Sequence, residues 1–123
     1  MNLTNQYCYF FDEAEFKETD RPGVRRRVVT GDNLQLWFWR IKGGSRGSYM
    51  HQHAENEQLG VIMRGQLDFR IGDKESEERV VLGEGEIYLA PKSIWHGDSI
   101  FVGDKEYDEV WILDVFAPVR TDV

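Results

Sequence analysis

The sequence predicts an all-β fold, a sandwich or barrel built from short strands. Short segments rich in β-branched and aromatic residues recur along the chain, and glycine-containing turns such as Gly72-Asp73 and Gly83-Glu84-Gly85 separate most of them. Helical periodicity is nearly absent, since only residues 12–17 are compatible with a helical turn. Short strands, glycine-rich turns and little helix are typical of sandwiches and barrels.

About eight strands are expected. The first, residues 24–29, is rich in valine and lies between the turn sequences Arg21-Pro22-Gly23 and Gly31-Asp32-Asn33. The second, residues 34–41, is rich in aromatic residues and ends before Gly43-Gly44. The other strands are expected at residues 48–53, 58–64, 66–71, 79–82, 86–90 and 109–116.

Length and composition limit the class of protein. The chain of 123 residues is long enough for one core, so we expect a single domain over residues 1–123, with an N-terminal arm (1–22) and a barrel (23–120). It has one cysteine, Cys8, no signal-peptide pattern and no apolar run near the about 20 residues of a membrane span. These features favour a cytoplasmic protein without a membrane partner.

The net charge of −7 disfavours nucleic acid as a partner, because nucleic-acid binding needs a positive surface. A small anionic substrate is still compatible with this charge if positive groups gather locally. Arg120 and the three arginines at residues 25–27 are the candidates. The alternative for residues 25–27 is a solvated edge strand.

All three histidines of the chain fall in one pattern. His51 and His53 are two residues apart, which places both side chains on one face of a β-strand. Neutral imidazole is the commonest side-chain ligand of first-row transition metals. With His96 and the side-chain carbonyl of Gln58, the pattern predicts a site for one divalent metal ion, and Ni, Zn, Fe, Mn and Co all suit this ligand set. A structural histidine cluster is the alternative.

Alternation along residues 58–64 predicts that both faces of this strand are covered. Gln58 and Ile62 share one face, whereas Leu59 and Met63 share the other, and both faces are largely apolar. One face would line the barrel interior. A second layer or a partner subunit would cover the other, so we expect a homodimer.

An aspartate lies on the inward face of the last predicted strand. Asp114 alternates with Ile112 and Phe116. A carboxylate between two large apolar residues is costly unless it is paired or functional. Pairing with an interior arginine, such as Arg64 or Arg70, is the alternative to a catalytic role.

Two motifs of the chain resemble the two motifs of the cupin family. They read His51-x-His53-x4-Gln58-x6-Gly65 and Gly85-x5-Pro91-x-Ser93-x2-His96. Gln58 stands where the family more often has glutamate, and Ser45 and Ser93 stand where it usually has glycine. The asparagine that often ends the second motif is missing. The resemblance implies a cupin double-stranded β-helix, a jelly-roll barrel in which the four candidate ligands converge.

A second resemblance is to the KdgF-like group of small cupins in pectin degradation. It is carried by Gly23-Val24-Arg25-Arg26-Arg27, by residues 64–71 and by the closing segment at residues 112–120, which reads ILDVFAPVR. In that group two histidines, a glutamine and a third histidine hold the metal. An aspartate, a phenylalanine and an arginine of the closing segment line the pocket. Their counterparts in this sequence are Asp114, Phe116 and Arg120.

The reaction implied by this resemblance is the ring opening of 4,5-unsaturated monouronates to linear keto-uronates. Asp114 would then be the general acid and base, and Arg120 would hold the substrate carboxylate. Phe116 would form a wall of the substrate pocket. Tyr49, on the face of His51, and Trp95, next to His96, are further expected substrate-binding residues.

Other functions fit the same barrel. An Fe(II) dioxygenase or another lyase or dehydratase is one alternative, although a neutral Gln58 does less than glutamate to stabilise oxidised iron. A non-catalytic ligand-binding or sensor cupin is another. A pocket filled by Trp37, Trp39 and Trp95 would indicate a binding module. Asp114 and Arg120 facing the metal site would instead indicate an enzyme.

Overall fold

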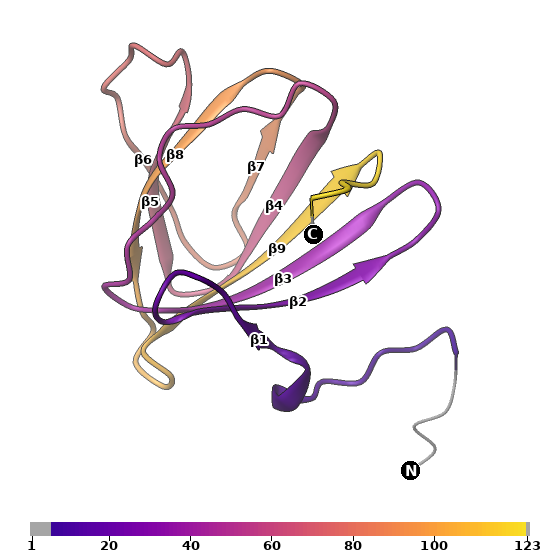
Figure 1. Cartoon of the computed structure of the whole chain (residues 1–123). Coiled ribbons are helices and arrows are strands. Elements are labelled where there is room, and N and C mark those ends of the chain that lie inside the picture. Colours follow the sequence, from indigo (N-terminus) through magenta and orange to yellow (C-terminus); the bar gives the residue numbers. More distant parts are fainter. Residues whose placement is uncertain (1–5, 123) are drawn as a thin grey trace.

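The computed structural model describes residues 6–122 and confirms the all-β jelly-roll fold (Figure 1). No helix in this part of the chain is long and apolar enough to cross a membrane. One short 3₁₀ helix, η1 (Glu13–Glu15), precedes the strands. The strands are β1 (Lys17–Glu18), β2 (Val24–Thr30), β3 (Gln35–Lys42), β4 (Glu57–Arg64), β5 (Gln66–Gly72), β6 (Val80–Leu82), β7 (Ile87–Ala90), β8 (Trp95–Val102) and β9 (Glu109–Ala117).

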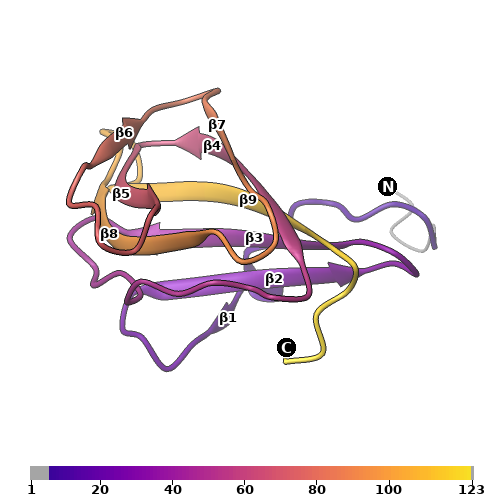
Figure 2. The same ribbon diagram turned by 90° about the horizontal axis from the view of Figure 1, so that it is seen from above.

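The strands form two antiparallel sheets that enclose the barrel (Figures 1 and 2). The larger sheet has the order β1-β2-β3-β9-β4-β7, and the smaller has the order β6-β5-β8. The inward side chains of β9 are all buried, and their polarity changes along the strand. Val110 and Ile112 are apolar, and they are followed by the carboxylate of Asp114 and by Phe116. One end of the barrel is therefore a packed apolar core, and the other end carries polar groups. The core consists of Val24, Ile41, Ile62, Leu67, Phe69, Phe101, Val110 and Ile112.

The N-terminal arm packs on the outer face of the larger sheet. Asp12 caps η1 by accepting a hydrogen bond from a backbone N–H of that helix, which confirms the helical turn expected at residues 12–17. Phe16 is buried against Phe38, with ring centres 5.0 Å apart, and Phe11 stacks on Trp111 at 5.7 Å. β1 then pairs with β2. Residues 1–5 of the expected arm lie outside the described residues.

One predicted strand is absent from the structure, and two observed strands, β1 and β8, were not predicted. Residues 48–53 are not a strand, because this segment meets β8 through an isolated bridge between His51 and His96 and one further backbone hydrogen bond, from Asp98 to Ser48. β8 itself was missed, since Gly97-Asp98 looks like a turn in the sequence. The structure places a bulge there instead, with positive φ at both residues and a register shift in the pairing with β5. Gly97 is needed at this point because a Cβ would lie 2.4 Å from the carbonyl oxygen of Tyr49.

One apolar strip on the outside of β4 and β7 is left open to solvent. Leu59 and Met63 on β4 are 38% and 45% exposed, and Ile87 and Leu89 on β7 are 57% and 53% exposed. Leu59 pairs directly with Leu89, so these side chains form a continuous surface. This is the second face of residues 58–64 that we expected a partner to cover, and the homodimer stays a prediction.

Candidate active site

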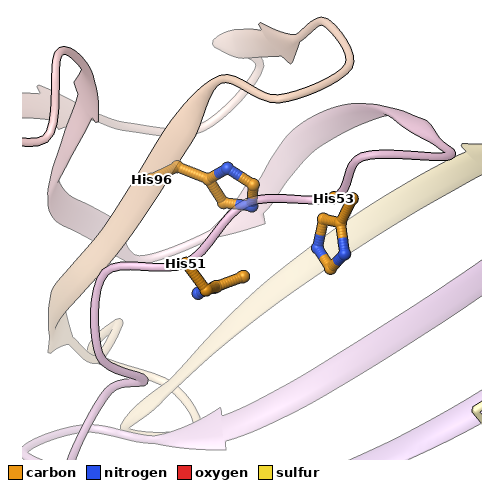
Figure 3. Close-up of side chains that lie close together, drawn as sticks. All are labelled: His51, His53 and His96. Carbon is orange, nitrogen blue, oxygen red and sulfur yellow. The ribbon is translucent and has the colours of Figure 1, made fainter.

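The structure brings the three histidines together at the polar end of the barrel (Figure 3). His51 and His53 lie on the segment before β4, and His96 lies on β8. One ligand atom from each lies within 4.8 Å of the others. Although the segment of His51 is not a strand, its two backbone hydrogen bonds with His96, both 2.9 Å, hold the pair side by side.

Hydrogen bonds leave the metal-binding nitrogens free. The Nδ1 atom of His51 lies 2.8 Å from the carbonyl oxygen of Tyr49, and that of His96 lies 3.0 Å from the carbonyl oxygen of Ile94. A carbonyl only accepts, so each Nδ1 carries the hydrogen and each Nε2 keeps its lone pair. Among the described residues, His96 Nε2 and Gln58 Oε1 are the buried side-chain atoms without a hydrogen-bond partner. These residues fit a divalent metal ion, because an ion would satisfy both orphaned atoms.

Two of the three histidines, His53 and His96, are held in the neutral form that binds metal. Burial lowers the pKa of His96 to about 4, and the neighbouring His51 acts in the same direction. Burial also lowers the pKa of His53 to about 4, followed in importance by the charge of Arg120. Since protonation competes with metal binding, these depressed pKa values keep two imidazoles available near neutral pH.

A chain of hydrogen bonds links Gln58 to Asp114. Gln58 Nε2 donates to the hydroxyl of Tyr88 over 2.8 Å, and that hydroxyl donates to Asp114 Oδ1 over 2.6 Å. The carboxylate can only accept, so Tyr88 must donate to it and must accept from the amide nitrogen of Gln58. The amide oxygen of Gln58 is therefore turned away from Tyr88, which explains why it is left without a partner. Trp39 Nε1 donates to the other carboxylate oxygen over 3.0 Å.

Gly60 makes room for this chain. On β4, Gly60 is the pairing partner of Tyr88 on β7 at one side and of Asp114 on β9 at the other. A Cβ at Gly60 would lie 2.1 Å from Cε1 of Tyr88, so only glycine allows the tyrosine ring to cross β4. Sequence analysis missed Tyr88, and it considered Trp39 only as a residue that could fill the pocket, not as a hydrogen-bond donor to Asp114. A glycine in the middle of an apolar strand was the signal that another group approaches closely there.

Asp114 is a buried carboxylate that forms no ion pair with an arginine within residues 6–122. Burial raises its pKa to about 6, although the hydrogen bond from Tyr88 and weaker effects lower it. The arginines proposed as alternative partners are engaged elsewhere: Arg64 pairs with Asp104 and Glu106, and Arg70 pairs with Asp98. A carboxyl group that titrates near pH 6 in a pocket can exchange protons at neutral pH.

The closing segment folds back over the pocket. The amide of Gln35, which is buried, lies 3.4 Å from the carbonyl oxygen of Arg120. The Arg120 guanidinium lies 4.3 Å from the ring centre of Trp37 and 4.6 Å from that of Phe116, and it pairs with Asp122. Arg120 and Phe116 both line the same cavity as the histidines and Asp114.

The other two predicted substrate-binding residues differ in position. Tyr49 lines the cavity, yet it is 79% exposed and its hydroxyl accepts a hydrogen bond from Arg46, so it lies at the mouth. Trp95 is not among the residues that line the cavity, and Lys74 lies 4.6 Å from its ring centre. The side chains of adjacent residues point to opposite faces of a strand, which is why Trp95 does not accompany His96. The cavity has a volume of about 440 Å³, within the range of small-molecule sites.

Comparison with known proteins agrees with this geometry. Residues 37–112 match the cupin domain. A search of curated proteins gave no match. The fold is similar to that of KdgF from Halomonas sp., with a TM-score of 0.74 and 24% identity over 94% of this chain and 97% of that one. It is also similar to an RmlC-like cupin from Shewanella frigidimarina, with a TM-score of 0.72 and 20% identity over 93% and 94% of the two chains.

Larger proteins contain the same barrel. A variant of oxalate decarboxylase from Bacillus subtilis matches with a TM-score of 0.66 and 21% identity, covering 88% of this chain and 29% of that one. At these identities the solved structures establish the fold, whereas the match to the cupin domain extends over more than half of the sequence. The chain belongs to the cupin family.

Proposed function

We propose that this cupin is a metal-dependent isomerase that opens the ring of 4,5-unsaturated monouronates to give linear keto-uronates. One observation carries the proposal: a buried carboxyl group with a raised pKa, Asp114, shares a cavity with three converging histidines and with Arg120. The similarity in fold to KdgF supports the same choice.

His51, His53, His96 and Gln58 would hold the metal. When bound, a divalent ion supplies a Lewis acid that stabilises negative charge as it develops on substrate oxygens. Imidazole and amide groups carry no charge when they bind a metal, so the charge of the ion would be left to attract an anionic substrate. Hydrogen bonds donated by Nδ1 of His51 and His96 and by the amide nitrogen of Gln58 orient these ligands before any ion binds.

Asp114 would move the proton. As a base, its carboxylate takes the proton of the anomeric hydroxyl, the C1 carbonyl forms, and the bond between C1 and the ring oxygen breaks. The electron pair stays on the ring oxygen as an enolate, and Asp114 then returns the proton to C4, which yields the ketone at C5. A pKa near 6 suits both halves of this cycle, because the group is ionised at neutral pH and its acid form is strong enough to protonate carbon.

Arg120 would orient the substrate. Its guanidinium is fixed by Trp37 and Phe116, and Nε and one N–H of Nη2 pair with Asp122. The two N–H groups of Nη1 and the second N–H of Nη2 are left for a substrate carboxylate. Phe116 lies between Arg120 and His53, with its ring centre 5.4 Å from that of His53, so it forms a wall next to the candidate ligands. These contacts give the bound sugar acid one orientation relative to Asp114.

The pocket favours an enzyme over a binding module. Trp37 and Trp39 line it, but Trp95 does not, and the cavity is not filled. Asp114 and Arg120 line it together. Asp114 and Arg120 in the pocket are the feature that we expected of an enzyme. A pocket filled by tryptophan side chains, which we expected of a binding module, is not found among the described residues.

The test is the stereochemistry of protonation at C4. In D₂O, spontaneous opening delivers deuterium to both faces of the enol, whereas a fixed Asp114 delivers it to one. Proton NMR of the product should therefore show a single deuterated diastereomer with the wild type. A mixture identical to the uncatalysed product would contradict the proposal.

A further inference from the structure

Arginines gather at the cavity in an otherwise acidic protein. Arg21, Arg26 and Arg120 all line it, although the chain carries a net charge of −7. The acidic residues that line the same cavity are Asp114, which is buried, and Asp122, which pairs with Arg120. The positive charge of Arg21 and Arg26 is therefore not balanced within the cavity.

Arg26 differs from its neighbours on β2. Arg25 pairs with Glu109 at 2.9 Å, and Arg27 donates to the carbonyl oxygen of Phe10, because odd-numbered residues of β2 face outward. Arg26 faces inward, opposite Trp39 in the strand pairing. The interpretation of residues 25–27 as a solvated edge strand therefore fails at Arg26.

The Arg26 guanidinium has aromatic contacts but no carboxylate. It lies 4.5 Å from the ring centre of Trp37 and 5.7 Å from that of Trp39. No ion pair or hydrogen bond to its guanidinium occurs within residues 6–122. Its five N–H donors are thus held by two indole rings at a cavity, with no protein acceptor.

Two other arginines of this protein, Arg40 and Arg79, differ from Arg26 because they form ion pairs with carboxylates. Arg40 also lies among aromatic rings, with Trp111 at 5.0 Å, but it pairs with both Glu109 and Glu13. Arg79 pairs with Asp68 and Asp98. Arg40 and Arg79 therefore each have two carboxylate partners, whereas Arg26 has none within residues 6–122.

Arg21 adds a second positive charge beside Arg26. Burial lowers the pKa of Arg21, Asp20 raises it, and the nearby charge of Arg26 lowers it again. The Arg21 guanidinium lies 5.9 Å from the ring centre of Trp39, which Arg26 also contacts. Two like charges near one indole repel each other, and a bound anion would relieve this repulsion.

We propose that Arg26, together with Arg21, forms a second anion-binding subsite of the cavity, distinct from Arg120. Arg26 and Arg120 both lie within 4.5 Å of the ring centre of Trp37, so the two cations flank one aromatic residue. The ligand class is a sugar acid with two anionic groups, one held by Arg120 and the other by Arg26. This inference rests on the proposed function in placing the substrate in this cavity, and it narrows that substrate to an unsaturated uronate that carries a second anionic group besides its carboxylate.

The test compares two linear sugar acids that differ in one charge. Gluconate has a carboxylate at one end and glucarate has one at both ends. Isothermal titration of the wild-type protein should show that glucarate binds about tenfold to a hundredfold more tightly than gluconate. Arg26→Gln should remove this preference and leave the affinity for gluconate unchanged. Arg27→Gln, which alters the outward neighbour, should keep the preference.

Equal binding of the two acids by the wild type would overturn the proposal without any variant. So would an Arg26→Gln variant that melts at the wild-type temperature and keeps the preference. Arg26→Lys retains the charge and loses the planar fork, and should give an intermediate preference. Binding requires no turnover, so a preference for glucarate in a protein that opens no ring would retain the subsite and reject only the isomerase.

Discussion

The hydroxyl of Tyr88 lies 2.6 Å from a carboxylate oxygen of Asp114 and accepts a hydrogen bond from the amide of Gln58. Tyr88 thereby connects the candidate proton-transfer group to a candidate metal ligand. Because a carboxylate can only accept, ionised Asp114 sets the direction of both hydrogen bonds. The orientation of the Gln58 carbonyl and the charge of Asp114 are therefore linked through one phenol.

Tyr88→Phe should disturb both groups at once. Loss of the hydroxyl removes the acceptor that orients Gln58, and we expect metal affinity to fall by about tenfold or more. It also removes a hydrogen bond that lowers the pKa of Asp114, so that pKa should rise above about 6. Metal titration and carboxyl ¹³C NMR of the metal-free protein measure the two effects. Tyr107→Phe, on an exposed tyrosine, is the control, and an unchanged Asp114 pKa in Tyr88→Phe would contradict the link.

Gly60→Ala should damage the site through packing alone. The added Cβ would lie 2.1 Å from Cε1 of Tyr88, so the ring must move away from Asp114. We expect the free energy of unfolding to fall by about 1–3 kcal/mol and the rate of ring opening to fall with it. Gly83→Ala is the matched control, because its Cβ would have 3.5 Å of clearance from the nearest atom. Equal stability of the two variants in urea denaturation would be inconsistent with the crossing of β4 by Tyr88.

Asp114→Asn should change the pH dependence of stability. Burial raises the pKa of Asp114 to about 6, above the 3.8 of an ordinary aspartate, so the folded state binds the proton more tightly. The stability from this group is present below pH 3.8 and is lost as the pH rises through about 6.

Relative to the wild type, the Asn variant should thus gain about 2–3 kcal/mol in free energy of unfolding between pH 4 and pH 7. Urea denaturation of both metal-free proteins at each pH measures this. Any pH-independent cost of Asn cancels in the comparison. A difference that stays constant with pH would show that Asp114 titrates normally.

The open apolar strip predicts the dimer interface. Replacement of Leu59 and Leu89 by lysine places charges on two paired strands and should prevent association. Light scattering should give twice the chain mass of 14.4 kDa for the wild type and the single mass for the double variant. Val81→Lys, at a residue 54% exposed on β6, should leave the dimer intact. A monomeric wild type would reject the homodimer.

Local patterns in the sequence were enough for an all-β sandwich or barrel, and the resemblance of two motifs to those of the cupin family implied the jelly-roll barrel in which the histidines converge. Alternation identified the inward face of β9, and the motif spacing identified His51, His53 and His96 as a group. The role of Tyr88 was not predicted because it depends on the register of β4 with β7 on one side and with β9 on the other. No local pattern in the sequence specifies this register. The bulge at Gly97 was hidden for a related reason, since a glycine next to an aspartate has the same sequence signature in a turn and in a bulge.

Ultraviolet absorbance of a freshly released unsaturated monouronate tests the central claim most directly. The conjugated enol ether absorbs and the open keto product does not, so the decay rate reports ring opening above its spontaneous background. We predict faster decay with the metal-loaded wild type, loss of that acceleration after chelation, its return when metal is restored, and the background rate with Asp114→Asn. Decay at the background rate with a wild type shown to carry metal would contradict the account.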